Sequence, residues 1–282
     1  MNATATTARA IDLGNGLQVT IDERGGEAAA PGTAVLLLHG GAGPQSVAGL
    51  AAALSGDARV VTPVHPGFDG TPRPPWLDSA AGLADAYLDL LDALSLDAVT
   101  VIGNSIGGWI AAEMGLRDIH GQITSLVLLN ANGIRPGNAA QVTDIRGLAP
   151  AEVGRLAFHN QALRPNPGAL SPEQLAVMAA NQQALATYAG EDFMFAPGLR
   201  RRLHRVTVPV LVAWGEADQV VSADYGRAYA AAFGNGRFQP IAEAGHLPQL
   251  EQPAAVLGAI ADFARGVAGR GRQRGSVAGN VA

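Results

Sequence analysis

Residues 99 to 116 read Val99-Thr-Val-Ile-Gly-Asn-Ser-Ile-Gly-Gly-Trp-Ile-Ala-Ala-Glu-Met-Gly-Leu116, and their character changes in the middle. The run 99–102 is apolar and rich in β-branched residues, which is typical of a buried strand. From Ile106 onward the pattern is helical. The Gly-x-Ser-x-Gly motif therefore lies between a strand and a helix, which is the context that a nucleophile elbow requires. We expect Ser105 to stand on this turn with its hydroxyl accessible.

The glycines and the helix start add a chemical reason to this prediction. A Cβ atom at Gly103 or Gly107 would keep the helix from packing close to the neighbouring strands. At the helix start the N–H of Ile106 is unpaired, and the helix dipole favours negative charge there. We predict that Ile106 donates to an oxyanion, together with the N–H of Gly41 in the glycine-rich segment 39–44 that follows an apolar run.

Further short apolar runs flank this segment on both sides. They occur at 34–38, 59–62, 125–129 and 210–214, with helical patterns between most of them. That alternation predicts an α/β fold with a mostly parallel sheet. An Asn15-Gly16 pair between alternating apolar residues predicts an antiparallel hairpin over 9–22. Covering helices are predicted over 79–94, 110–116 and 256–263.

One interval, 133–205, contains no strand candidate but has two helix starts, near Pro150 and at Ser171. The sequence Ser171-Pro-Glu-Gln174 has the form of a capping box with Pro at the first helical position. We therefore divide the chain into a core (1–132 and 206–265) and a helical cap (133–205). The Gly- and Arg-rich remainder, 266–282, is predicted to be a disordered tail, with a nucleic-acid arm as the less favoured interpretation.

A serine hydroxyl needs a base, and the base needs a carboxylate that holds its tautomer. Of the six histidines, His246 lies in a loop between the expected last strand, 237–240, and the final helix, at the sheet edge where sites form. Asp218 follows the strand 210–214. The chain order Ser, acid, His is the one expected with a Gly-x-Ser-x-Gly nucleophile elbow. Glu216 is the alternative acid.

The composition excludes several classes of catalytic chemistry. The chain of 282 residues has a net charge of −5, no Cys and, by inspection, no Lys. Thiolate nucleophiles, Cys-based metal sites, Schiff-base lysines and P-loops are therefore absent. The acidic balance offers no surface for nucleic acid. We expect a small-molecule substrate and neither a cofactor nor a metal ion.

Two further sequence features predict the location of the protein. Residues 1–10 lack the basic start and apolar core of a leader, and no apolar run reaches about 18 residues. These features predict a cytoplasmic protein without membrane association. Whether it forms a homo-oligomer is left open.

Several short motifs together resemble the α/β-hydrolase superfamily. They are His39-Gly-Gly, Pro66-Gly-Phe, Gly103-Asn-Ser-Ile-Gly-Gly, Gly215-Glu-Ala-Asp and Gly245-His-Leu-Pro, in the family's order. The resemblance spans about residues 16–263. It implies a mainly parallel sheet with a helical cap after the sixth strand, and the roles of nucleophile, acid and base for Ser105, Asp218 and His246.

Within the superfamily, the Asn before the nucleophile and the loop 39–44 resemble hydrolases that cleave carbon–carbon bonds of aromatic ring-fission products. Those enzymes usually have an aromatic residue where this chain has Leu247, and their cap arginine has four candidates: Arg135, Arg146, Arg155 and Arg164. The superfamily also contains ligand receptors and cofactor-free cyclases.

The principal expectation is a serine hydrolase that cleaves an ester, thioester or lactone through an acyl-enzyme, and carbon–carbon hydrolysis and ligand reception are the alternatives. The cap aromatics suggest a small, mostly apolar substrate, although such residues more often form a core of their own. The candidate substrate-binding residues are His39, Trp109, Phe193, Phe195 and Leu247.

Overall fold

The computed structural model describes residues 7–26, 33–138 and 141–278. Within them eight strands form one sheet in the order β1-β2-β4-β3-β5-β6-β7-β8. Strand β2 is antiparallel to β1 and β4, whereas β3 to β8 pair in parallel. The predicted mostly parallel sheet is confirmed. The strand bounds are β1 (Thr7–Asp12), β2 (Gln18–Arg24), β3 (Ala34–Leu38), β4 (Arg59–Pro63), β5 (Val99–Asn104), β6 (Ile123–Leu129), β7 (Val210–Gly215) and β8 (Gly236–Ile241).

The turn between β1 and β2 is formed by residues that tolerate positive φ. Gly14, Asn15 and Gly16 have φ of 78°, 50° and 74°, values that glycine and asparagine adopt more readily than other residues. The N–H of Leu17 donates to the carbonyl of Gly14 at 2.8 Å and closes the turn. The hairpin predicted from the Asn-Gly pair is therefore present.

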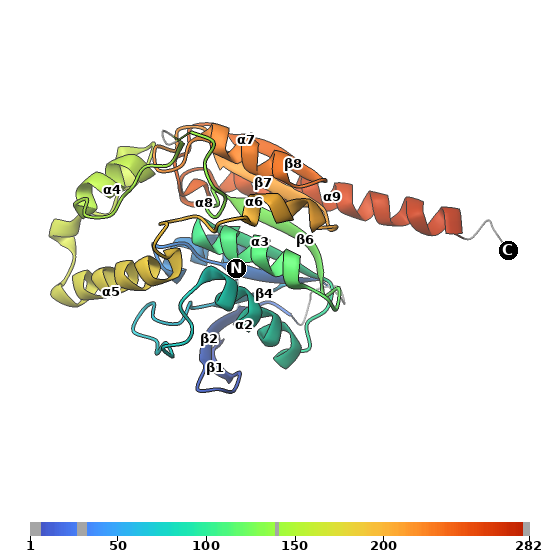
Figure 1. Cartoon of the computed structure of the whole chain (residues 1–282), viewed down its shortest axis with the longest axis horizontal. Helices are drawn as coiled ribbons and strands as arrows, with labels where there is room; N and C mark the ends of the chain where they lie inside the picture. The colour runs from blue at the N-terminus through green and yellow to red at the C-terminus, as the bar shows by residue number, and fades with distance from the viewer. Residues whose placement is uncertain (1–6, 27–32, 139–140, 279–282) are drawn as a thin grey trace.

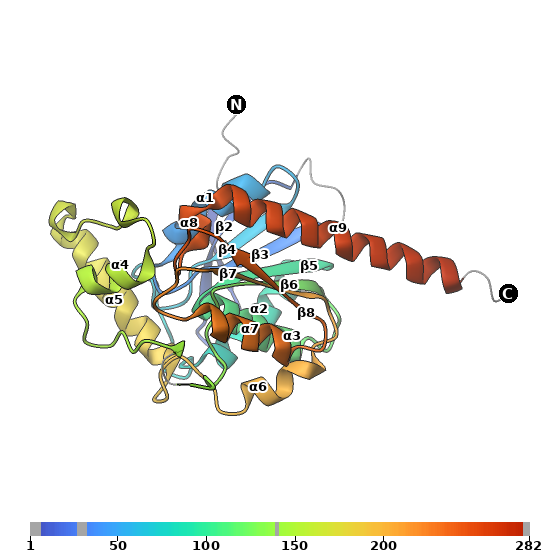
Figure 2. The ribbon, with the colours of Figure 1, turned by 90° about the horizontal axis from the view of Figure 1, so that it is seen from above.

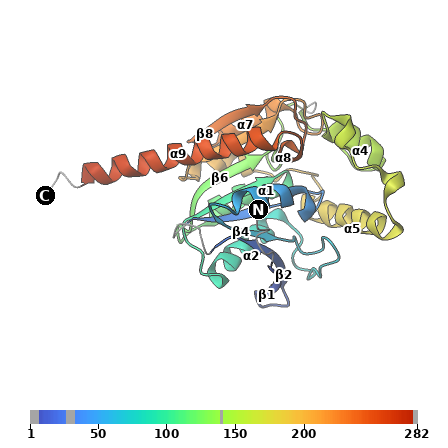
Figure 3. The same ribbon diagram turned by 180° about the vertical axis from the view of Figure 1, so that it is seen from behind.

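Helices cover both faces of the sheet (Figure 2). Helices α1 (Ala48–Leu54) and α9 (Pro253–Ala278) lie on one face, and α2 (Ala80–Ala93), α3 (Ile106–Arg117) and α7 (Ala223–Ala232) lie on the other. Seen from behind, α1 and α9 lie in front of the sheet (Figure 3). Alternate residues of β3 belong to the two apolar layers, Leu36 to one and Leu37 to the other. Burial on both faces explains why this strand is a continuous apolar run.

The chain between β6 and β7 is helical, as expected for a cap inserted after the sixth strand. It contains α4 (Pro150–Ala157), α5 (Pro172–Ala189) and α6 (Leu199–Arg202), and α4 and α5 extend beyond the sheet at the left of Figure 1. The predicted capping box is formed at Ser171: its hydroxyl accepts from the N–H of Gln174, whose side chain accepts from the N–H of Ser171. An ion pair of 3.0 Å between Arg202 and the buried Glu113 joins the end of this insertion to α3.

The expectation of a disordered tail over 266–282 differs from the structure. Helix α9 continues through this segment to Ala278 and projects from the body of the molecule (Figure 1); residues 279–282 lie outside the described ones. The helix is already formed where Val256 and Phe263 are buried, so its extension requires propagation without a new nucleation step. Each glycine costs about 1 kcal/mol but does not prevent this, and arginine favours it.

No helix in the described part of the chain combines the length and the apolar character needed to cross a membrane.

Candidate active site

The turn after β5 holds Ser105 in a strained conformation, with φ 55° and ψ −120°. The two flanking glycines are required by close backbone contacts. A Cβ at Gly103 would lie 2.2 Å from the carbonyl oxygen of Gly107, and one at Gly107 would lie 2.4 Å from that of Leu38. Helix α3 thus packs directly against the ends of β3 and β5. This geometry raises the Ser105 hydroxyl above the carboxyl edge of the sheet.

Three residues predicted from the sequence are brought together by the loops after β5, β7 and β8. The Nε2 atom of His246 lies 2.9 Å from Oγ of Ser105, and its Nδ1 lies 2.8 Å from Oδ2 of Asp218. The three residues are 8%, 4% and 6% exposed, in that order, so bulk water competes little for these bonds. Glu216, the alternative acid, is exposed and has no hydrogen bond to His246 among the described residues.

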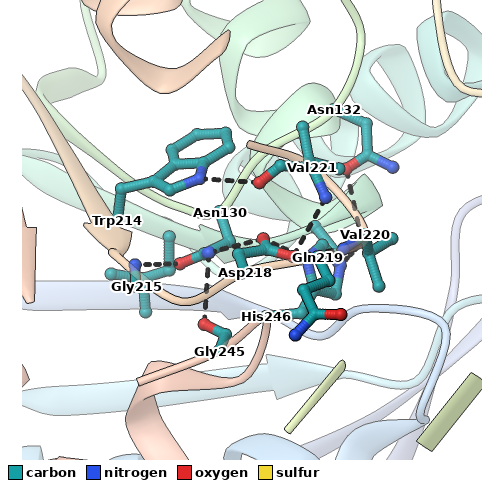
Figure 4. Close-up of polar contacts among 12 residues, drawn as sticks. Asn130, Asn132, Trp214, Gly215, Asp218, Gln219, Val220, Val221, Gly245 and His246 are labelled. Carbon is teal, nitrogen blue, oxygen red and sulfur yellow. Dashed lines mark hydrogen bonds and ion pairs between the residues drawn. The ribbon is translucent and has the colours of Figure 1, made fainter. Parts of the chain in front are cut away.

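The carboxylate of Asp218 is held by further donors (Figure 4). Its Oδ1 accepts from the N–H groups of Val220 and Val221 at 2.8 and 2.9 Å. Its Oδ2 accepts from Nδ2 of Asn130 at 2.7 Å, besides the bond to His246. These donors leave the carboxylate little freedom to rotate, so it presents Oδ2 to the imidazole.

Asn130 and Asn132 are site residues that the sequence analysis did not identify. Oδ1 of Asn130 accepts from the N–H of Gly215 at 3.1 Å, which joins the loops after β6 and β7. The N–H of Asn132 donates to the carbonyl of Ser105 at 3.2 Å, and its Oδ1 lies 3.5 Å from the hydroxyl. Asn130 directly follows the buried strand β6, and Asn132 comes two residues later. The same signal, a polar residue at the carboxyl end of a strand, would have found them.

The histidine loop is braced by the cap. The N–H of His246 donates to the carbonyl of Ala157, at the end of α4, at 2.7 Å. In α8 (Pro248–Glu251) the Glu251 carboxylate accepts from the N–H groups of Gly245 and Asn160, each at 2.6 Å. The first cap helix therefore contributes directly to the position of the imidazole.

A cavity of about 460 Å³ opens above Ser105 and His246. Helices α4 and α5 form much of its wall, and Arg164 and Gln182 supply polar groups. Its apolar lining includes Phe158, Met178, Leu185, Met194 and Leu247. A predominantly apolar cavity of this size accommodates a small to medium organic molecule.

Of the five residues predicted to bind substrate, Leu247 lines the cavity and the other four do not. Trp109 packs against Gly133, where an added Cβ would lie 2.6 Å from its ring. Arginines of the cap lie over the two phenylalanines: Arg146 is 4.6 Å from the ring centre of Phe193. Arg135 is 5.4 Å from that of Phe195. His39 is wholly buried and does not line the cavity.

The two residues predicted to donate to an oxyanion occupy the cavity wall and the start of α3. Gly41 lines the cavity, and a Cβ at its neighbour Gly40 would lie 3.0 Å from Cβ of Ser105. Ile106 is the first residue of α3, so its N–H has no partner within the helix.

Two buried histidines lie under this loop. Burial lowers the pKa of His39 to about 4 and that of His65 well below its ordinary value, where the nearby His39 adds to the effect. Both rings are therefore neutral at physiological pH.

The chain belongs to the alpha/beta hydrolase family, whose model matches residues 35–259. It is 30% identical over 253 residues to a pimeloyl-[acyl-carrier protein] methyl ester esterase of Aromatoleum aromaticum, which covers 82% of this chain and 98% of that protein. It is 33% identical over 139 residues to a 2-hydroxy-6-oxo-2,4-heptadienoate hydrolase of Pseudomonas putida, across 47% and 48% of the two chains. Among solved structures, a bacterial membrane phospholipase A superposes with a TM-score of 0.79 at 22% identity, over 93% of this chain and 86% of that one. The family and the two relatives of known sequence support a hydrolase activity, and the solved structure shows the shared fold.

Proposed function

We propose that the protein is a serine hydrolase that cleaves an ester, thioester or lactone of a small, mostly apolar substrate. The observation that carries this proposal is the unbroken chain of hydrogen bonds from Ser105 through His246 to Asp218 at the floor of an apolar cavity. A serine hydroxyl becomes a useful nucleophile when a base of this kind takes its proton, and a buried carboxylate stabilises the resulting imidazolium.

The proposed reaction has two halves. Oγ of Ser105 attacks the carbonyl carbon while Nε2 of His246 takes the hydroxyl proton, and the N–H groups of Gly41 and Ile106 hold the oxyanion. The tetrahedral intermediate expels the alcohol or thiol, which receives the proton from His246. Water then attacks the acyl-enzyme, again with His246 as base, and releases the acid and the free Ser105.

The cavity supports an acyl group of moderate length. Its apolar wall favours hydrocarbon, at about 25 cal/mol for each Å² removed from water, and its volume is within the range of small-molecule sites. The relative from Aromatoleum aromaticum is named as a methyl ester esterase. Methyl and p-nitrophenyl esters of medium-chain acids are therefore the first substrates to test.

The test is to label the protein with a fluorophosphonate probe and measure its intact mass, then to assay esters of increasing acyl length. We expect one adduct on the wild type, none on Ser105→Ala, and a loss of turnover of at least about 10³-fold in that variant. No adduct on a folded wild-type protein would contradict the proposal and favour a ligand receptor or cyclase.

A second candidate is hydrolysis of a carbon–carbon bond in a ring-fission-type diketone. The observation that favours it is Arg164, which lines the cavity. Its Nε donates to the carbonyl of Gln161 at 3.2 Å, and it has no carboxylate partner among the described side chains, so its two terminal amino groups can pair with an acidic substrate. A dienoic ring-fission analogue should then be cleaved by the wild type and bound more weakly by Arg164→Gln. Arg155→Gln is the control, since Arg155 does not line the cavity.

A further inference from the structure

His39 ends the segment that leads from β3 into the cavity wall, and its ring is wholly buried. Nε2 of His39 accepts a hydrogen bond of 3.0 Å from the main-chain N–H of His65. Nδ1 lies 2.7 Å from the carbonyl oxygen of Gly40. A neutral imidazole has one donor and one acceptor nitrogen. Because Nε2 accepts, the proton is on Nδ1, which donates to the carbonyl of Gly40.

That bond determines the direction of the next N–H group. The carbonyl of Gly40 and the N–H of Gly41 belong to one planar trans peptide, so they point in opposite directions. The carbonyl is held by His39 and by the N–H of Gly43 at 3.1 Å. The N–H of Gly41 is thereby directed away from the imidazole, and Gly41 lines the cavity.

Apart from the turn hydrogen bond from Gly43, the local backbone does little to enforce this orientation. Two consecutive glycines permit many backbone conformations, so the Gly40–Gly41 peptide could rotate at small cost. Rotation would direct a carbonyl dipole toward the cavity, where it would repel an oxyanion and remove one donor. A side chain that donates a hydrogen bond to the Gly40 carbonyl would therefore restrict this rotation.

His39 is itself held in place by a second buried histidine, His65. Nε2 of His65 donates to the carbonyl of His39 at 2.9 Å, and its Nδ1 accepts from the hydroxyl of Tyr87 at 2.5 Å. The two imidazole rings lie 3.8 Å apart, and Phe68 packs edge-on against His39 at 5.0 Å. All ring nitrogens are used, which fixes both tautomers and leaves His39 little freedom.

We propose that His39 is a positioning residue that sets the orientation of the Gly40–Gly41 peptide, so that the N–H of Gly41 is available to an oxyanion. This inference rests on the proposed function, in which Gly41 is an oxyanion donor. His39 acts through the peptide and touches no reacting atom.

Two substitutions separate the two nitrogens of the ring. The amide of His39→Asn places a donor where Nδ1 lies, so it retains the bond to Gly40. The amide of His39→Gln reaches toward the position of Nε2, where it accepts from His65, but it leaves the Gly40 carbonyl with the N–H of Gly43 as its one remaining donor. Phe68→Leu is the matched control, because it loosens the packing around His39 and leaves its hydrogen bonds in place.

The experiment measures acylation and deacylation of a p-nitrophenyl ester, together with the affinity for an alkyl boronic acid as a mimic of the tetrahedral intermediate. Loss of one oxyanion donor typically costs about 10²–10³ in rate. For His39→Gln we expect both steps to slow by about this factor, boronate binding to weaken in parallel, and KM to change little. His39→Asn should recover most of the rate. Phe68→Leu should lower the stability of the protein but retain the wild-type rate.

Equal rates for His39→Gln and wild type, or equal losses in His39→Gln and Phe68→Leu at equal stability, would overturn the inference. A wild type that turns over and loses activity in Ser105→Ala would in that case leave the proposed function standing. The ¹⁵N spectrum of the His39 ring supplies a test that needs no turnover. The Nδ1–H tautomer is expected, and the Nε2–H tautomer would refute the argument whatever the activity.

Discussion

Lowering the pH from 7.5 to 5.0 should destabilise the folded protein through the buried pair His39 and His65. Burial lowers the pKa of His39 to about 4, from an ordinary value of 6.5. The hydrogen bond to the Gly40 carbonyl and, more weakly, the charge of Asp69 act in the opposite direction and only partly offset the burial. In the unfolded chain His39 therefore binds a proton below about pH 6.5, whereas in the folded chain it stays neutral down to about pH 4. Stability is then lost as the pH falls through this window, and it is unaffected above it.

The magnitude follows from the two values. At pH 5.0 the unfolded His39 is almost fully protonated and the folded one is mostly neutral, so the free energy of unfolding falls by about 2 kcal/mol relative to pH 7.5. His65, whose pKa is lowered well below its ordinary value by burial and by His39, acts in the same direction. Tyr87, the hydroxyl that faces His65, has a pKa raised well above 10 and does not titrate here.

The assay is urea denaturation at the two pH values, on wild type and on His39→Asn, which cannot titrate. The variant should lose about 2 kcal/mol of the pH dependence. A protein in which the exposed His120, His159 and His204 are all replaced by Asn should retain it. If wild type and His39→Asn show the same dependence, His39 is not the buried neutral group described here.

Three further predictions concern the packing of α3, the orientation of the Asp218 carboxylate and the N-cap of α5. Gly107→Ala should prevent folding or cost more than about 3 kcal/mol, because its Cβ would lie 2.4 Å from a backbone oxygen. Gly115→Ala should cost less in the same urea assay, since its Cβ would meet side-chain atoms of Leu126 and Val206 rather than backbone atoms. Asn130→Ala removes a donor from a buried carboxylate, a bond worth about 1.5–3 kcal/mol; kcat should fall roughly ten- to hundredfold with KM little changed, and an unchanged kcat would contradict the role of Asn130. Ser171→Ala should lower stability by about 1 kcal/mol through loss of the α5 cap, whereas Ser171→Thr should retain most of it.

Much of the fold could be read from local patterns. The elbow is encoded within a few residues, because strand periodicity, two glycines and helix periodicity meet at Ser105. Asp218 and His246 could be placed because each follows a strand in a parallel sheet, so the topology brings both to one edge. The capping box at Ser171 is equally local. In each case the physical determinant lies within one turn or one strand of the residue concerned.

Other features depend on contacts between distant segments. Whether Phe193 and Phe195 face the cavity or the arginines of the cap depends on how the insertion packs, which no short period encodes. Helix α9 outlasts the apolar pattern that predicted it, since a helix anchored at one end propagates through residues of modest propensity.

The sequence by itself determined the α/β architecture, the helical insertion after the sixth strand, and the loops that carry Ser105, Asp218 and His246. The tertiary structure decided which side chains form the cavity wall, that Asn130 holds the Asp218 carboxylate, and that His39 is buried outside that wall. The reason is physical: consecutive glycines leave the Gly40–Gly41 peptide few local restraints, and its carbonyl is held by the N–H of Gly43 and by the ring of His39. The partner of that ring, His65, follows a different strand.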